Sequence, residues 1–240
     1  MIPQISIENV NLKFYFSFGV KKEKNSGKNM TDDYYYENCS RRINTVKLKF
    51  IIEKSYRGLN KQKYKTLLPY LKKTHKLYQK SWDEINDGFF KTVDKITGYS
   101  WKYKTYFCVL SPFYRGISSW GGNKIVRTWR ENPYSMRKIT AHELLISHIF
   151  TIFEKDFQKE NLTDKQKWAL AEISAWAITG LEKKMLKFWP WISEDEKYPL
   201  NHNYPELYNL QRKLKLVYAK KKNFRSFLQK SIKIIRREKL

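Results

Sequence analysis

Residues 139–153 read ITAHELLISHIFTIF, and this stretch decides the fold. Apolar side chains occupy nearly the whole helical circumference, which is typical of a helix that is packed on all sides. His142, Glu143 and His148 interrupt this run, so the sequence predicts a buried His-Glu helix. Burying an ionised carboxylate without a partner costs roughly several kcal/mol, so a cation, a donor or a raised pKa must compensate. A zinc ion is one such cation.

A second helix follows and carries another carboxylate. Thr163 and Gln166 have the spacing of a capping box, which predicts the helix start. Within this helix Glu172 has Trp168 four residues before it and Trp176 four residues after it. Because residues four apart share a helix face, we expect Glu172 to be partly buried among aromatic rings. A salt bridge with one of the many lysines is the alternative for this carboxylate.

Strands precede these helices. Alternating patterns predict strands at 4–18, 45–52, 103–110 and 124–129, and a helical pattern occupies 61–97. Strands early and helices late indicate an α+β fold with a small mixed or antiparallel sheet. We expect an N-terminal strand region at 1–60 and a domain at 61–240 that ends in basic helices, together forming one globular unit.

Local signals place the element boundaries. The 61–97 region divides into two helices, with Pro69 near the start of the first and Gly98 ending the second. The glycines Gly116, Gly121 and Gly122 predict a loop between the last two strands, and Ser135 is the expected N-cap of the His-Glu helix. His75 lies among lysines and is expected at the surface.

The formal net charge is +25, which raises the possibility of nucleic-acid binding. Basic residues are spread along most of the chain, so a basic solvated surface with weak nonspecific nucleic-acid binding is the simpler interpretation. Two basic amphipathic helices are expected near the C-terminus, where cations at 220–239 alternate with Phe224, Phe227 and Ile235. We favour docking of their apolar side onto the domain over binding of nucleic acid.

The N-terminus lacks the pattern of a signal peptide, and no later stretch is apolar enough to span a bilayer. Cytoplasmic residence is therefore expected. Cys39 and Cys108 are isolated and do not form a zinc-knuckle pattern.

The spacing of the histidines differs from that of the H-E-x-x-H zinc signature, in which both histidines lie on one helix face. Ile146 stands four residues after His142, whereas His148 stands six residues after it and about 120° around an ideal helix. A shared zinc would require a break or a π-bulge between the two histidines. The alternative for His148 is a core histidine that is bonded to a carbonyl group.

The string at 139–145, the residues Ala171 and Glu172, and the stretch 89–110 resemble a poorly characterised bacterial family of zincin-like metallopeptidases. The similarity covers most of the chain after about residue 82 and also includes the Tyr-Pro motifs with the downstream Leu210, Arg212 and Phe224.

The resemblance implies a zinc-dependent metallopeptidase that hydrolyses peptide bonds with metal-activated water. It makes His142 the first zinc ligand, Glu143 the general base and Glu172 the third ligand, while Ile146 occupies the place of the second ligand. His148 or His202 would have to substitute.

A peptide or protein substrate follows from the same resemblance. The strand at 124–129 could pair with an extended peptide, and Tyr198, Tyr204 or His202 could stabilise an oxyanion. Two alternatives remain open at this point. One is a catalytically inactive zincin-fold binding protein, which Ile146 favours, and the other is a basic nucleic-acid-associated protein.

Overall fold

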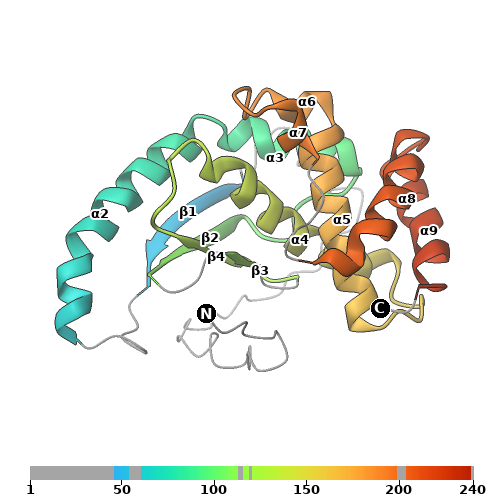
Figure 1. Ribbon diagram of the computed structural model, residues 1–240, viewed down its shortest axis with the longest axis horizontal. Helices are drawn as coiled ribbons and strands as arrows, with labels where there is room; N and C mark the ends of the chain where they lie inside the picture. Colours follow the sequence, from blue (N-terminus) through green and yellow to red (C-terminus); the bar gives the residue numbers. More distant parts are fainter. Residues whose placement is uncertain (1–45, 54–60, 113–115, 119–120, 199–203, 239–240) are drawn as a thin grey trace, which may run out of the picture. The chain divides into compact units, whose positions relative to one another are not determined.

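The computed structural model describes residues 46–53, 61–112, 116–118, 121–198 and 204–238. These all lie in the larger of two compact units, residues 44–240. The strand predicted at 4–18 and residue His202 lie outside the described residues. Figure 1 shows the elements, which are β1 (Lys47–Ile52), α2 (Lys61–Asp83), α3 (Asn86–Thr97), β2 (Thr105–Ser111), β3 (Gly116–Ser118), β4 (Lys124–Thr128), α4 (Met136–Asp156), α5 (Asp164–Leu181), α6 (Lys183–Leu186), α7 (Glu194–Lys197), a 3-10 turn (Pro205–Leu207), α8 (Tyr208–Ala219) and α9 (Phe224–Ile235).

The four described strands form one mixed sheet in the order β1-β2-β4-β3. Strands β1, β2 and β4 are parallel, and β3 pairs antiparallel with β4 at the edge. The predicted mixed α and β composition is confirmed, whereas the alternative of a wholly antiparallel sheet is wrong. Helices α2 and α3 connect β1 to β2, and a helical crossover of this kind places the two strands parallel. Because β1 belongs to this sheet, the predicted strand at 45–52 is part of the larger unit.

The loop predicted around Gly116 is partly a strand, because residues Gly116–Ser118 pair with Ile125–Arg127 as β3 and β4. The other side of β4 pairs with β2 along Phe107–Ser111. Both sides of β4 are therefore occupied over Ile125–Arg127, and this central part has no edge that could receive an extended peptide. The expected peptide-pairing role of 124–129 does not fit this position.

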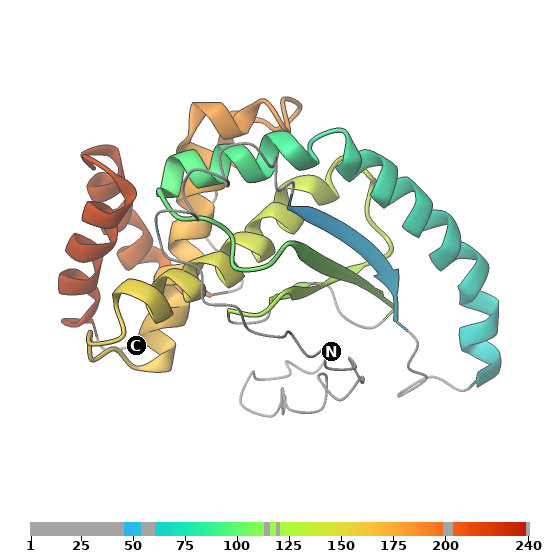
Figure 2. The same cartoon turned by 180° about the vertical axis from the view of Figure 1, so that it is seen from behind.

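One face of the sheet packs against helices. Leu48, Phe50, Cys108 and Ile125 are buried on this face, and Phe50 lies opposite Cys108 in the parallel register. Helix α2 contacts β1, α4 contacts β3 and β4, and α5 lies beside α4. Figures 1 and 2 show α2, α3 and α4 on the same side of the sheet. This packing holds the His-Glu helix between the sheet and α5.

Helices α2 and α3 confirm the division predicted for 61–97. Gly98 ends α3 with a φ of 75°, a left-handed conformation that glycine adopts without steric cost. Pro69 is not near the start of α2 but well inside it. The helix begins at Lys61, where the predicted helical pattern begins, and Tyr64 in its first turns is buried and donates a hydrogen bond to the backbone oxygen of Glu53.

Helix α4 is buried around nearly its whole circumference, as the apolar run predicted. It is continuous over Met136–Asp156, so no break or π-bulge separates His142 from His148. Ser135 precedes the helix, but its side chain makes no capping hydrogen bond. The amide of Met136 instead donates to the backbone oxygen of Asn132 at 3.0 Å.

The C-terminal half follows the predicted pattern. Both hydrogen bonds of the Thr163–Gln166 capping box are present at the start of α5. Helices α8 and α9 bury Phe224, Phe227 and Ile235, so the docking interpretation of these helices is confirmed. No helix among the described residues has the length and hydropathy needed to cross a membrane.

Candidate functional site

His142 and Glu172 meet where α4 packs against α5. The Nε2 atom of His142 lies 2.8 Å from Oε2 of Glu172, and the two residues are only 4% and 8% exposed. The structure therefore brings together two of the predicted zinc ligands, thirty positions apart in the chain. The other ring nitrogen of His142, Nδ1, is buried and has no hydrogen-bond partner among the described residues. An imidazole that donates from Nε2 to the carboxylate leaves Nδ1 as a bare acceptor.

The ring of Trp176 packs against the imidazole of His142. Its ring centroid lies 4.3 Å from that of His142, and it stands one helical turn after Glu172 on the same face of α5. The ammonium group of Lys138 lies 5.2 Å from the Trp176 ring and donates to the backbone oxygen of Lys197 at 3.1 Å. Trp176, a member of the aromatic face predicted around Glu172, thus contacts the imidazole of His142.

Glu143 is half-buried, and its carboxylate makes no hydrogen bond or ion pair with any described residue. Protein atoms nevertheless surround it closely, so desolvation raises its pKa to about 7. The nearby charge of Glu172 raises this pKa further, whereas His142 and Arg127 lower it. A carboxyl group with a pKa near neutrality can both accept and release a proton, which is the property required of a general base.

Of the two oxyanion candidates among the described residues, Tyr204 is the one whose hydroxyl interacts electrostatically with Glu172 and Glu143. Its ring packs edge-on against Trp168, with the centroids 4.6 Å apart. Burial, followed by the charges of Glu172 and Glu143, raises the pKa of Tyr204 to about 12. The hydroxyl therefore remains a protonated donor at neutral pH. Tyr198, by contrast, donates its hydroxyl to the backbone oxygen of Gln211 at 3.3 Å.

His148 lies in a different environment from His142. Its ring stacks on Trp101 with the centroids 4.3 Å apart and the planes inclined by 26°. The Nε2 atom lies 3.3 Å from the hydroxyl oxygen of Thr97, rather than from a carbonyl group. Complete burial lowers the pKa of His148 to about 3, so the ring is neutral at physiological pH. The structure does not bring His148 to the pair formed by His142 and Glu172.

Ile146 stands one helical turn after His142, where the H-E-x-x-H signature has its second histidine. The side chain is 1% exposed and belongs to the hydrophobic core. Catalytic zinc usually has three protein ligands, and here the described residues supply only His142 and Glu172 to one place. No group of three metal-binding side chains occurs among the described residues. The described donors alone therefore fall one ligand short of a catalytic zinc site.

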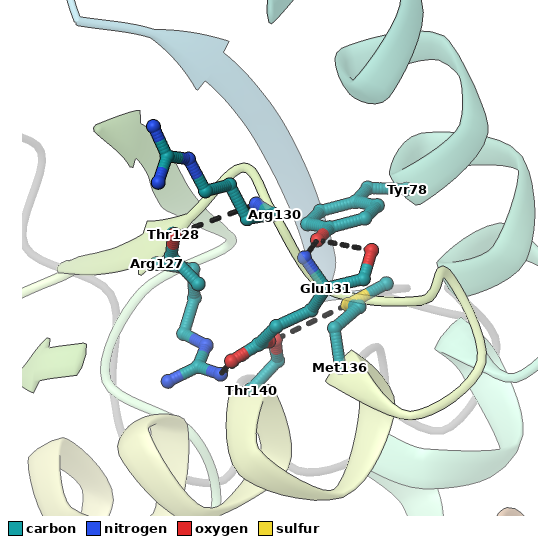
Figure 3. Close-up of polar contacts among 7 residues, drawn as sticks. All are labelled: Tyr78, Arg127, Thr128, Arg130, Glu131, Met136 and Thr140. Atoms are coloured by element: carbon teal, nitrogen blue, oxygen red, sulfur yellow. Dashed lines mark hydrogen bonds and ion pairs between the residues drawn. The ribbon is translucent and has the colours of Figure 1, made fainter. Parts of the chain in front are cut away.

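Arg127 is a buried cation that the sequence analysis did not single out. It is 3% exposed, and its Nη2 atom lies 2.6 and 2.5 Å from the two carboxylate oxygens of Glu131. Tyr78 fixes the backbone of Glu131, because its hydroxyl donates to the carbonyl group at 2.8 Å and accepts from the amide at 2.9 Å. Figure 3 shows this cluster beside the first turns of α4, near Thr140.

A sequence signal for this cluster does exist. Arg127 follows Ile125 by two residues on the inward face of β4, and Glu131 stands four residues later. An arginine at an inward strand position requires a buried partner, which makes the nearby acid the obvious candidate. The positive charge of Arg127 also lowers the pKa of Glu143.

Comparisons with protein-family models, with curated proteins and with solved structures find no match for this chain. The resemblance to zincin-like metallopeptidases therefore rests on the residues themselves.

Proposed function

We propose that this chain is a zincin-like protein of metallopeptidase descent whose zinc site is incomplete, and that it acts by binding a peptide or protein rather than as a zinc hydrolase. The observation that carries the proposal is the position of Ile146. This apolar side chain occupies the place of the second histidine and is 1% exposed within the core.

The surroundings of His148 support the same conclusion. A substitute ligand would have to reach the imidazole of His142, but α4 is continuous and His148 stacks on Trp101. Its hydrogen bond to Thr97 and its low pKa are those of a neutral core histidine. These contacts with Trp101 and Thr97 support the alternative interpretation of His148 as a core residue.

The metallopeptidase ancestry is supported by the order of the elements and by the residues that remain. A helix, a strand pair, the His-Glu helix and a carboxylate-bearing helix follow one another, which is the element order of a compact zincin domain. His142, Glu143 and Glu172 occupy the positions that the resemblance assigns to the first ligand, the general base and the third ligand. The peptide nature of the ligand is inferred from this resemblance.

A second candidate is the active zinc metallopeptidase, and the pKa of Glu143 favours it. A carboxyl group with a pKa of about 7 that lies beside His142 and Glu172 is suited to accept a proton from water. In this case a further ligand would have to come from outside the described residues, where His202 is the remaining histidine. Zinc as a cofactor belongs to this candidate alone.

Metal analysis of the untagged wild-type chain, after dialysis against a zinc-containing buffer, separates the two candidates. The binding-protein proposal predicts no stoichiometric zinc in the wild type. About one zinc per chain, lost in both His142→Ala and His202→Ala, would instead establish a complete site and support the hydrolase. The His75→Ala variant is the matched control, since His75 hydrogen-bonds the backbone oxygen of Phe50 on another part of the domain.

A further inference from the structure

The outer face of helix α2 is strongly basic. The exposed lysines along it are Lys61, Lys63, Lys65, Lys72, Lys73, Lys76 and Lys80. The helix contains a single acidic residue, Asp83, at its last position. Because α2 contacts β1 with its opposite side, this row of ammonium groups faces solvent.

The charges on α2 are available to a partner. Lys72, Lys73, Lys76 and Lys80 form no ion pair with any described residue. The cations of the C-terminal helices differ in this respect, since several of them are paired within the domain. The paired residues are Lys213 with Glu238, Lys221 with Glu182, Arg225 with Asp156 and Arg236 with Glu160.

An exposed aromatic ring, Tyr70, and a half-buried one, Trp129, lie beside the lysines of α2. Tyr70 is 58% exposed, and its ring centroid lies 6.1 Å from that of Trp129 at the end of β4. The guanidinium group of Arg130 lies 5.1 Å from the Trp129 ring and is itself exposed. In Figure 3, Arg130 points away from the buried Arg127. A hydrogen bond connects α2 to the segment that follows β4, because the hydroxyl of Thr74 donates to the backbone oxygen of Trp129 at 3.2 Å.

We infer that the lysine face of α2, together with Tyr70, Trp129 and Arg130, binds single-stranded nucleic acid. Proteins that bind single strands combine a track of cations for the phosphates with aromatic rings on which bases stack. Both parts are present here, and Tyr70 and Lys73 lie one helical turn apart on the same face. This activity lies beyond the peptide-binding role proposed above and is independent of it.

A single strand fits this surface better than an anionic membrane does. Membrane-surface helices bury a broad apolar face, whereas Leu77 is the exposed large aliphatic residue of α2 among seven lysines. A base can stack on the exposed ring of Tyr70, and duplex DNA offers no unstacked base for this contact. Arg130 adds a cation beside the same aromatic pair.

The test is fluorescence anisotropy of the full chain with a labelled oligothymidylate of about 20 nucleotides, titrated at several salt concentrations. Tyr70→Ala is expected to weaken binding about fivefold or more, as the loss of one stacked base does. The double variant Lys73→Glu/Lys76→Glu should weaken it further and lower the slope of log K against log salt by about 0.7 for each phosphate that the protein no longer neutralises.

Matched controls distinguish binding of the oligonucleotide at α2 from its nonspecific attraction to a basic protein. Lys230→Glu/Lys233→Glu on α9 makes the same change of charge at the same spacing, and both lysines are exposed. Tyr134→Ala removes another half-exposed tyrosine, two residues before α4 begins at Met136. Both controls should retain wild-type affinity within about twofold.

Three results would overturn the inference. One is equal weakening by the α9 and α2 double variants, and the second is no effect of Tyr70→Ala on oligothymidylate binding. The third is binding to phosphatidylserine vesicles that depends on Tyr70 while oligonucleotide binding does not. A parallel titration with oligouridylate shows whether single-stranded RNA or DNA is preferred. Binding to either one that depends on Tyr70 supports the inference.

Discussion

The Nε2 atom of His142 and the Oε2 atom of Glu172 lie 2.8 Å apart between two packed helices, so each buried polar group is the partner of the other. The contact links α4 to α5 within the core of the domain. Removing either side chain leaves the other buried without its partner, and an unsatisfied buried polar group costs more than the hydrogen bond contributes.

The first prediction concerns the coupling of this pair. His142→Ala and Glu172→Ala should each lower the free energy of unfolding by about 1–3 kcal/mol. The double variant should be less destabilised than the sum of the single variants, with a coupling of about 0.5–3 kcal/mol. Urea unfolding of the four proteins measures this cycle. Strictly additive effects would show that the two side chains do not interact in solution.

Glu143 should make the protein less stable as the pH rises. Its pKa is about 7 in the folded chain and near 4.5 when unfolded, so the folded state binds the proton more tightly. The contribution to stability is complete below about pH 4.5 and is lost as the pH rises through 7. Glu143→Gln should therefore be more stable than the wild type by about 1–3 kcal/mol at about pH 8.

The exposed residue Glu206 supplies the control for Glu143. Glu206→Gln should leave the difference in unfolding free energy between about pH 5 and pH 8 unchanged. If Glu143→Gln shows the same pH dependence as the wild type, the carboxyl group is not desolvated in the folded protein.

The buried His148 should make the protein less stable as the pH falls. Burial lowers its pKa from 6.5 to about 3, so the unfolded chain binds the proton more tightly. The contribution of His148 to stability is complete above about pH 6.5 and is lost as the pH falls toward 3. At about pH 5 the loss amounts to about 2 kcal/mol. His148→Phe preserves a ring against Trp101 and should abolish this loss. An unchanged acid sensitivity in the variant would show that other groups are responsible.

Gly180 is required where α5 passes the last residue of α7, Lys197. A Cβ atom at this position would lie 1.7 Å from the backbone oxygen of Lys197. Gly180→Ala should therefore destabilise the protein by about 1–3 kcal/mol or more, because backbone cannot move aside cheaply. Gly88→Ala is the matched control within a helix, since its Cβ would meet the ring of Phe188 at 3.0 Å. Thermal unfolding compares the two, and equal melting temperatures would contradict the close approach.

Several elements could be predicted because their signals are local. The apolar run of α4, the Thr163–Gln166 capping box and Gly98 at the end of α3 are all properties of short segments. Strand direction and strand order are not local. Whether β4 lies inside the sheet or at its edge depends on β3, a strand of three residues whose glycine suggested a loop.

The candidate site was likewise predictable from sequence only in part. The burial of Glu172 followed from the aromatic face of α5, whereas its association with His142 was implied only by the resemblance to zincin-like metallopeptidases. The position of His148 could not be settled from sequence, because it depended on whether α4 carries a bulge. Arg127 was not among the predicted site residues, although its alternation with Ile125 places it on the inward face of β4.

The measurement that tests the incomplete zinc site most directly is the zinc content of Ile146→His beside that of the wild type. If Ile146 alone interrupts the site, the new histidine joins His142 and Glu172 as the third ligand. The account predicts about one zinc per chain in Ile146→His, none in the wild type or in Ile146→Gln, and none once His142→Ala is added. Stoichiometric zinc in the wild type, or none in a folded Ile146→His variant, would contradict it.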